Sequence, residues 1–198
     1  MSKTLFLPGA GGASAFWQPV ASQLPSAWPK VLFSWPGLGD QPASPHINCI
    51  DDLVSLVATE MDSRVDLIAQ SMGGVVAARI AIERPNEVRH LVLTATSAGL
   101  NMTNLGASEW RNNYRKNFPN AAKWITERDA AAPLAVEDIT APTLLIWGDS
   151  DPISPVAVGE ELLQRIPNAQ LEIVSGGDHD MAVLQPELVA GLIQKHFS

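Results

Sequence analysis

Short apolar runs alternate with amphipathic segments along the chain, and this alternation predicts strands separated by helices. Each expected strand is a nearly continuous apolar run followed by turn residues, and the runs lie at 4–7, 31–34, 65–69, 91–95, 143–147 and 171–174. Continuous runs are typical of strands that are buried on both faces. Between them, apolar residues recur at helical spacing, as at Leu53, Leu56 and Val57. Strands alternating with helices predict an α/β fold in which helices cover both faces of a parallel sheet.

One interval, residues 97–141, breaks this alternation because it contains no strand pattern. Within it, Trp110, Tyr114 and Phe118 are spaced four apart, and Trp124 follows. About 45 residues is much longer than an ordinary connection, so the interval is either an inserted cap or a functional loop. Two interpretations of its aromatic residues stay open. They attach a short helical lid to the body, or they line a substrate pocket.

The overall composition fits one globular domain, residues 1–198, and argues against several classes of function. Since 21 acidic residues face 13 basic ones, the net charge is -8, whereas nucleic acid and anionic membranes both require basic patches. No apolar run approaches the roughly 20 residues of a membrane span, and the first residues lack a signal-peptide pattern. The lone Cys49 cannot close an internal disulfide. We therefore expect a cytoplasmic protein with neither nucleic acid nor a membrane as a partner, and the oligomeric state is left open.

A candidate nucleophile lies where the third expected strand meets a helical pattern, in the sequence Ala69-Gln70-Ser71-Met72-Gly73-Gly74. Small residues two places before and after the serine allow a sharp, strained strand-to-helix turn. Such a turn exposes the serine oxygen at the end of the sheet and leaves the backbone N–H of Met72 free to donate to an anion. The sequence therefore predicts a nucleophile elbow at Ser71.

Partners for this serine occur downstream. A serine hydroxyl needs an imidazole to accept its proton and a carboxylate to orient that imidazole. Asp149 and Asp151 both follow the fifth expected strand, and His179 follows the sixth. The order Ser, Asp, His along the chain is one of the orders in which this triad is known to occur.

Several motifs in this order resemble the α/β-hydrolase superfamily, and within it the short serine hydrolases that include esterases, lactonases and carbon-carbon bond hydrolases. Besides the elbow, the motifs are Leu7-Pro8-Gly9-Ala10-Gly11-Gly12, Trp35-Pro36-Gly37-Leu38-Gly39-Asp40, Trp147-Gly148-Asp149-Ser150-Asp151 and Gly177-Asp178-His179. The resemblance covers nearly the whole chain. It implies an α/β-hydrolase fold with about six parallel strands in the order 2-1-3-4-5-6. Residues 97–141 would form a short helical lid, and the first two strands common in the family would be missing.

The resemblance also implies a role for each candidate residue. Ser71 would be the nucleophile and His179 the base, and the family spacing selects Asp151 rather than Asp149 as the acid. The acyl oxyanion would be held by the N–H groups of Ala10 and Met72.

The loop that carries Ala10 departs from the family at one point, because the family often has His-Gly where this chain has Pro8-Gly9. Since the donor is a backbone group, the change should alter the shape of the oxyanion hole without abolishing it. In the lid, we expect Trp110, Tyr114 and Trp124 to bind substrate.

Neither a metal nor a cofactor is expected, because the chain has no His-Glu-x-x-His motif, no paired cysteines and no calcium-loop pattern. The glycines at 9–12 do not complete a dinucleotide loop, since Ser14 occupies the final position, and no Walker lysine follows. The other histidines receive structural interpretations: His46 as a loop residue, His90 as a residue preceding a strand, and His196 as a residue near the tail.

Together these features predict a cofactor-independent serine hydrolase that cleaves small carboxylic esters through an acyl-enzyme on Ser71, with lactones and thioesters as further candidates. An elbow serine, in place of an aspartate, disfavours dehalogenase and epoxide-hydrolase chemistry. One alternative is a carbon-carbon bond hydrolase or lyase that uses the same triad, and a second is a non-catalytic binding protein. Fold and triad do not separate ester cleavage from carbon-carbon cleavage.

Overall fold

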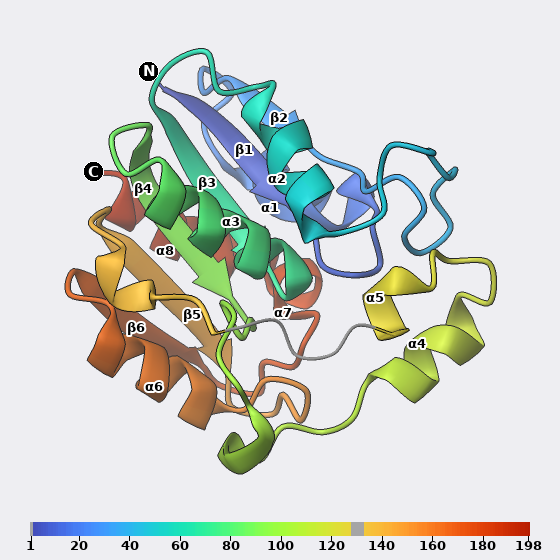
Figure 1. The fold of residues 1–198 in the computed structure, drawn as a ribbon. Helices are drawn as coiled ribbons and strands as arrows, with labels where there is room; N and C mark the ends of the chain where they lie inside the picture. Colours follow the sequence, from blue (N-terminus) through green and yellow to red (C-terminus); the bar gives the residue numbers. More distant parts are fainter. Residues whose placement is uncertain (1, 128–132) are drawn as a thin grey trace.

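The computed structural model describes residues 2–127 and 133–198, so the lid interval 97–141 is described except for residues 128–132 (Figure 1). Six strands form one parallel sheet in the order β2-β1-β3-β4-β5-β6. Their bounds are Lys3–Leu7 (β1), Lys30–Leu32 (β2), Val65–Gln70 (β3), Val88–Thr94 (β4), Thr143–Gly148 (β5) and Ala169–Val174 (β6). The predicted fold class and strand order are confirmed.

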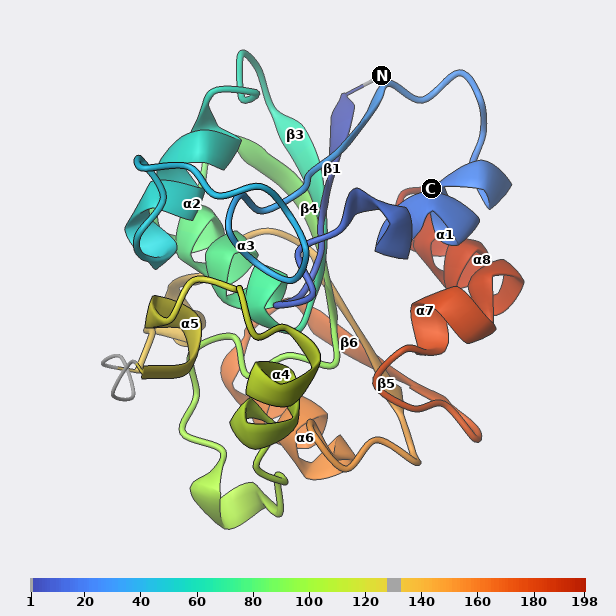
Figure 2. The same ribbon diagram turned by 90° about the vertical axis from the view of Figure 1, so that its right-hand side faces the viewer.

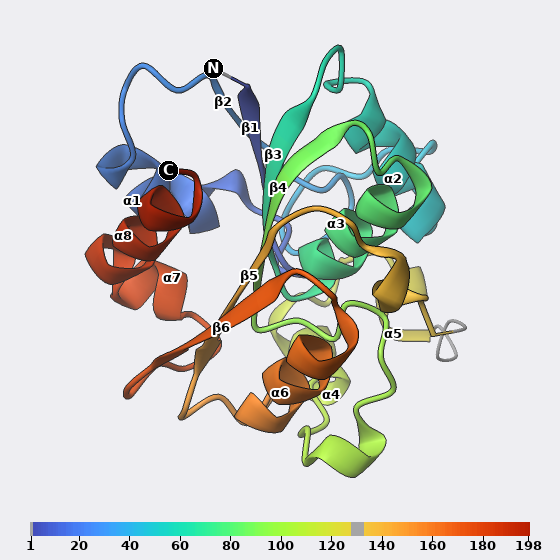
Figure 3. The same cartoon turned by 90° about the vertical axis from the view of Figure 1, so that its left-hand side faces the viewer.

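Helices cover both faces of this sheet, as two opposite views show, each perpendicular to the view of Figure 1 (Figure 2 and Figure 3). One face carries Ile50–Ala58 (α2), Met72–Glu83 (α3) and Val156–Arg165 (α6), and the other carries Gln18–Gln23 (α1), Met181–Leu184 (α7) and Pro186–His196 (α8). Successive strand side chains point to opposite faces, so Leu67 enters the first hydrophobic core and Ile68 the second. Both cores need apolar residues, which explains why the strands read as continuous apolar runs.

Each strand differs from its predicted run by one to three residues at one or both ends, and two of these differences are informative. β2 stops at Leu32 instead of residue 34, because the chain turns inward there and buries Trp35, whose indole N–H donates to Pro8 O at 2.7 Å. β4 begins at Val88, so His90 lies inside a strand, and the interpretation that it precedes one is wrong. The imidazole of His90 pairs with the buried carboxylate of Asp66 on β3, which satisfies a polar residue within an otherwise apolar sheet.

The described part of interval 97–141 contains helical turns and no strand. These turns are Thr103–Leu105 (η2), Arg111–Asn117 (α4), Trp124–Glu127 (α5) and Val136–Asp138 (η3). Helices α4 and α5 lie beyond the carboxyl ends of β1 and β3 (Figure 1 and Figure 2). Among the described residues, no helix combines the length and the apolar character that crossing a bilayer requires. We use the name lid segment below for the described residues 97–127 and 133–141, after the prediction that this interval forms a lid.

Candidate active site

Ser71 occupies the turn between β3 and α3, and its backbone is strained. Its φ of 52° and ψ of -121° lie in a region that residues with a side chain rarely adopt. Three hydrogen bonds hold this conformation: the Ser71 N–H donates to Thr94 O at 3.0 Å, and the Ser71 carbonyl accepts from the Thr96 hydroxyl at 2.5 Å and from the Gly74 N–H at 2.9 Å. The predicted nucleophile elbow is therefore present as a backbone feature.

The two glycines after Ser71 are required by close approach to neighbouring segments. A Cβ at Gly73 would collide with the carbonyl oxygens of Leu7 and Pro8 at the end of β1. A Cβ at Gly74 would collide with the Thr96 side chain beyond the end of β4. Because both positions lack side chains, the amino end of α3 packs directly against the ends of two strands, and Ser71 is fixed between them.

His179 and Asp151 complete a chain of hydrogen bonds that starts at Ser71. His179 Nε2 lies 3.1 Å from Ser71 Oγ, and His179 Nδ1 lies 2.8 Å from Asp151 Oδ2. Asp151 follows β5, and His179 lies between β6 and α7, so three separate segments converge at this point. The structure brings together all three residues that the sequence selected.

The surroundings of Asp151 determine which nitrogen of the His179 imidazole carries the hydrogen. Its side chain is fully buried, and Oδ1 accepts backbone N–H groups from Ile153 at 2.7 Å and Ser154 at 3.1 Å. A carboxylate can only accept hydrogen bonds, so Oδ2 accepts from the imidazole. In the neutral imidazole, Nδ1 therefore carries the hydrogen, and the lone pair on Nε2 faces the Ser71 hydroxyl.

Asp149, the other carboxylate considered from the sequence, has a different role. It is exposed, and its Oδ1 accepts from the Gly176 N–H at 2.7 Å and from the Ser150 hydroxyl at 3.0 Å. These bonds connect the turn after β5 to the turn after β6. Asp149 thus braces the two loops, while Asp151 contacts the imidazole.

The loops that carry Asp151 and His179 are also packed backbone to backbone. The Ser150 N–H donates to Gly177 O at 2.9 Å, and a Cβ at Gly148 would collide with that same carbonyl. Because Gly148 and Gly177 lack side chains, the two loops lie close enough for the hydrogen bond between the Asp151 carboxylate and the His179 imidazole.

The loop after β1 places Ala10 beside the elbow. A Cβ on Gly9 would meet the side-chain amide oxygen of Gln70 and would lie 3.0 Å from Ser71 Cβ, so the loop passes directly over the elbow. Among the described residues, no hydrogen bond uses the backbone N–H of Ala10 or of Met72. Met72 is the first residue of α3, where N–H groups have no partner within the helix. Both groups are free to donate, and their role as an oxyanion hole stays a prediction.

Gln70 is a residue of this site that the sequence analysis passed over. It is the last residue of β3, its side chain is buried, and its amide Nε2 donates to the His179 carbonyl at 3.2 Å. The amide therefore connects the elbow to the histidine loop. A polar residue at the end of a wholly buried strand was the available signal, because buried amides almost always bond to something specific.

The lid aromatics are placed in different surroundings. The Tyr114 hydroxyl donates to Ala10 O at 2.8 Å and accepts from the Gly39 N–H at 2.9 Å, and burial raises the pKa of this phenol. The Trp110 ring meets Tyr114 edge-on at 5.7 Å between ring centres. The indole N–H of Trp124 is buried and has no partner among the described residues. Substrate binding by these three residues stays a prediction.

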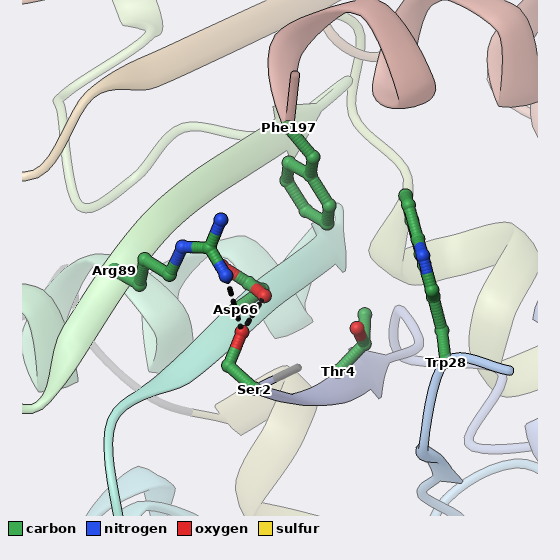
Figure 4. Close-up of a pocket in the computed structure, with 6 residues that line it drawn as sticks. All are labelled: Ser2, Thr4, Trp28, Asp66, Arg89 and Phe197. Carbon is green, nitrogen blue, oxygen red and sulfur yellow. Dashed lines mark hydrogen bonds between the residues drawn. The ribbon is translucent and has the colours of Figure 1, made fainter.

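A separate pocket of about 250 Å³ lies at the opposite end of the sheet (Figure 4). It is lined by Ser2, Thr4, Trp28, Asp66, Arg89 and Phe197. The strand residues among them come from the amino ends of β1, β3 and β4, whereas Ser71 follows the carboxyl end of β3. The pocket is therefore separate from the cluster around Ser71.

No group of three or more His, Cys, Asp or Glu within residues 2–127 and 133–198 is arranged to hold a metal ion.

Comparisons with known proteins find similar families and a similar curated relative. A family model described as alpha/beta hydrolase fold matches residues 5–137, and one described as TAP-like protein matches residues 107–196. A curated relative from Neisseria meningitidis serogroup A is a pimeloyl-acyl-carrier-protein methyl ester esterase. It is 26% identical over an alignment of 236 residues, gaps included, which covers 97% of this chain and 75% of the relative.

Solved structures show the same fold. A membrane phospholipase A described as a bacterial virulence factor superposes with a TM-score of 0.80 at 21% identity, covering 99% of this chain and 78% of the other. A serine hydrolase involved in carbazole degradation superposes with a TM-score of 0.78 at 20% identity, covering 100% of this chain and 90% of the other.

Proposed function

The chain belongs to the α/β-hydrolase fold family, and we propose that it is a cofactor-independent serine hydrolase of small carboxylic esters. The observation that carries this proposal is the continuous hydrogen-bonded chain from Ser71 through His179 to the buried Asp151. The esterase relative supports the choice of an ester as substrate, because it aligns with 97% of this chain.

In the first half of the proposed reaction, Ser71 Oγ attacks the ester carbonyl while His179 Nε2 takes its proton. Asp151 holds the imidazole by Nδ1 and stabilises the positive charge that forms on the ring. The carbonyl oxygen becomes an oxyanion, which the N–H groups of Ala10 and Met72 receive. Preorganised donors of this kind act where charge develops, so they lower the barrier without reorganising during the step.

Collapse of the tetrahedral intermediate then expels the alcohol, which takes the proton from His179 and leaves an acyl group on Ser71. Water attacks this acyl-enzyme with His179 again as base, and the acid product leaves. All groups needed for both halves are supplied by this chain, so the proposal requires no metal or cofactor. It also treats residues 1–198 as one domain whose lid segment closes over the substrate.

The proposal is tested with a panel of p-nitrophenyl esters of increasing acyl length, together with a lactone, a thioester and a carbon-carbon substrate. Exposure to a fluorophosphonate runs in parallel, followed by peptide mass spectrometry. We expect turnover of the short esters and a phosphonyl adduct on Ser71. An adduct on Ser71 without turnover of any ester, lactone or thioester would instead support carbon-carbon cleavage or lyase chemistry. If the protein forms no adduct and turns over no substrate, only a binding function remains.

A further inference from the structure

The chain has a single tyrosine, Tyr114, and its hydroxyl connects α4 to the loops that follow β1 and β2. Tyr114 belongs to α4, only 8% of its surface is exposed, and its hydroxyl makes one hydrogen bond as a donor and one as an acceptor. Both partners are backbone groups: the Ala10 carbonyl after β1 and the Gly39 N–H after β2. This hydroxyl is thus fully engaged with the protein itself.

The two loops that receive this hydroxyl are packed tightly against each other. A Cβ on Gly39 would collide with the Gly11 carbonyl, and a Cβ on Gly12, whose φ is 73°, would lie 2.6 Å from Leu38 O. The Trp35 N–H also donates to Gly12 O at 2.8 Å. Because backbone meets backbone without intervening side chains, residues 8–12 and 35–39 form one rigid unit.

The orientation of the Ala10 N–H follows from the bonds within this unit. The Gly9 carbonyl accepts from the Gly12 N–H at 3.0 Å, and in a trans peptide the N–H points opposite to the carbonyl. The Ala10 N–H, which shares that peptide group, therefore points away from Gly12. The flanking carbonyls are also held: Pro8 O by the Trp35 indole, and Ala10 O by Tyr114.

Tyr114 connects α4 of the lid segment to this unit. A second bond joins the same parts, since the Ala122 N–H donates to Gly37 O at 2.7 Å. The position of α4 and the position of the loop that carries Ala10 are consequently linked through a phenol oxygen.

We propose that Tyr114 is a positioning residue, which couples docking of the lid segment to the geometry of the oxyanion hole. This inference rests on the proposed function, because it assigns the Ala10 N–H to the oxyanion. When the hydroxyl is present, the Ala10 carbonyl is fixed, and the preceding peptide, whose N–H points away from Gly12, is held in place beside the elbow. When it is absent, the loop loses this hydrogen bond to α4, and the donor is less well aimed.

The first test is Tyr114→Phe, which removes one oxygen and keeps the ring. We expect kcat for a short p-nitrophenyl ester to fall about 10- to 100-fold, since small misplacement of an oxyanion donor is costly, while KM changes by less than about 2-fold. Affinity for an alkyl boronic acid, which forms a tetrahedral anion on the serine, should fall in parallel with kcat/KM.

A matched control is Phe118→Leu. Phe118 packs on the Tyr114 ring at 5.0 Å between centres and bears no hydroxyl. The Phe118→Leu substitution should lower the melting temperature about as much as Tyr114→Phe does. It should leave kcat and boronate affinity within about 2-fold of the wild-type values. Equal losses of kcat in both variants would mean that general loosening of the lid segment is responsible, which would overturn the inference.

A second measurement needs no substitution. Because the chain contains one tyrosine, biosynthetic 3-fluorotyrosine gives a single fluorine NMR resonance that reports on residue 114. We expect that resonance to shift when a fluorophosphonate occupies Ser71. A resonance that is unchanged by the adduct, combined with full kcat in Tyr114→Phe, would overturn the coupling while leaving the hydrolase proposal intact.

Failure of the proposed function has a different signature. If the wild-type protein turns over no ester but Ser71 is phosphonylated, the phosphonylation rate replaces kcat, and Tyr114→Phe should slow it by a similar factor. If the wild-type protein is neither active nor phosphonylated, the hydrolase proposal and this inference are both wrong.

Discussion

Ser71 is held in an unfavourable backbone conformation by its neighbours. A residue with a side chain at positive φ is destabilised by roughly 1 to 3 kcal/mol, and such strain persists only where surrounding contacts enforce it. Here Thr94, Thr96 and Gly74 supply those contacts, and the glycines at 73 and 74 permit the packing. The result is a hydroxyl that is fixed in front of an imidazole.

Asp151→Asn and Asp149→Asn should have different effects. An amide at 151 presents a donor to His179 and favours the wrong tautomer, so we expect kcat to fall on the order of 10⁴-fold with little change in fold. Asp149→Asn should leave kcat within about 10-fold and lower the melting temperature, because it weakens the brace between two turns. Steady-state kinetics and thermal unfolding of both variants check this. Sensitivity at 149 with indifference at 151 would contradict the assignment.

Gln70→Met should reduce activity by about 10-fold, because it removes the donor to the His179 carbonyl but keeps the length of the side chain. Gln194→Met is a matched control, since Gln194 also donates to a backbone carbonyl at 3.2 Å, but on the surface of α8. We expect kcat to fall for Gln70→Met only. Equal kinetics in both variants would show that the histidine loop keeps its position without Gln70.

Helix α3 and its preceding strand were predictable because local rules agree there: an apolar run, small residues at the turn, and helical spacing up to Pro85. The order of strands and the choice of Asp151 over Asp149 followed from the resemblance to the α/β-hydrolase superfamily, which rests on motifs close to strand ends. The links made by Gln70 and Tyr114 were not predictable, because each joins segments about 100 residues apart through a single polar atom. No periodicity records such a contact.

Interval 97–141 was identified by the absence of a strand pattern, yet its aromatic spacing did not distinguish attachment from substrate binding. Tyr114 attaches α4 by its hydroxyl, while Trp110 stays partly exposed beside it. The same aromatic stripe thus contains a residue bonded to the body and a residue that is partly exposed.

Trp110→Ala should change the preference for acyl length. If the indole contacts the acyl chain, losing it should alter the ratio of kcat/KM between long and short esters by about 10- to 200-fold. The measurement is kcat/KM across the p-nitrophenyl ester series, with melting temperature as the control. A lower melting temperature with an unchanged ranking of esters would mean that Trp110 only attaches the lid segment.

The whole fold is one sheet with a hydrophobic core on each face. Because every strand contributes side chains to one or both cores, neither core can be lost without disrupting the sheet. We therefore expect the folded chain to unfold in one cooperative transition, with the lid segment attached through its bonds to residues 37–39.

The free energy of unfolding of the chain should decrease at alkaline pH because Tyr114 ionises. Burial raises the pKa of its phenol above the ordinary value of 10.0, and the charge of Asp40 acts in the same direction, whereas donation by Gly39 lowers it. A raised pKa favours the neutral phenol in the folded state. The contribution of the neutral phenol to stability is complete below about pH 10. It is lost as the pH rises through the pKa of the phenol in the folded state.

The wild-type protein should accordingly lose more melting temperature between about pH 9 and about pH 11 than Tyr114→Phe does. Absorbance of tyrosinate, which reports only on this residue, should appear at higher pH in the folded protein than in urea. Identical pH dependence in the two proteins would show that the phenol does not contribute.

The most direct test of the hydrolase proposal is steady-state hydrolysis of p-nitrophenyl butyrate by the wild-type protein and by Ser71→Ala, purified identically. The substitution removes one oxygen, so the melting temperature should stay within a few degrees. Since triad residues act as a unit, we predict that kcat falls by about 10³-fold or more. A folded Ser71→Ala protein that keeps the wild-type kcat would contradict the proposal that Ser71 is the nucleophile.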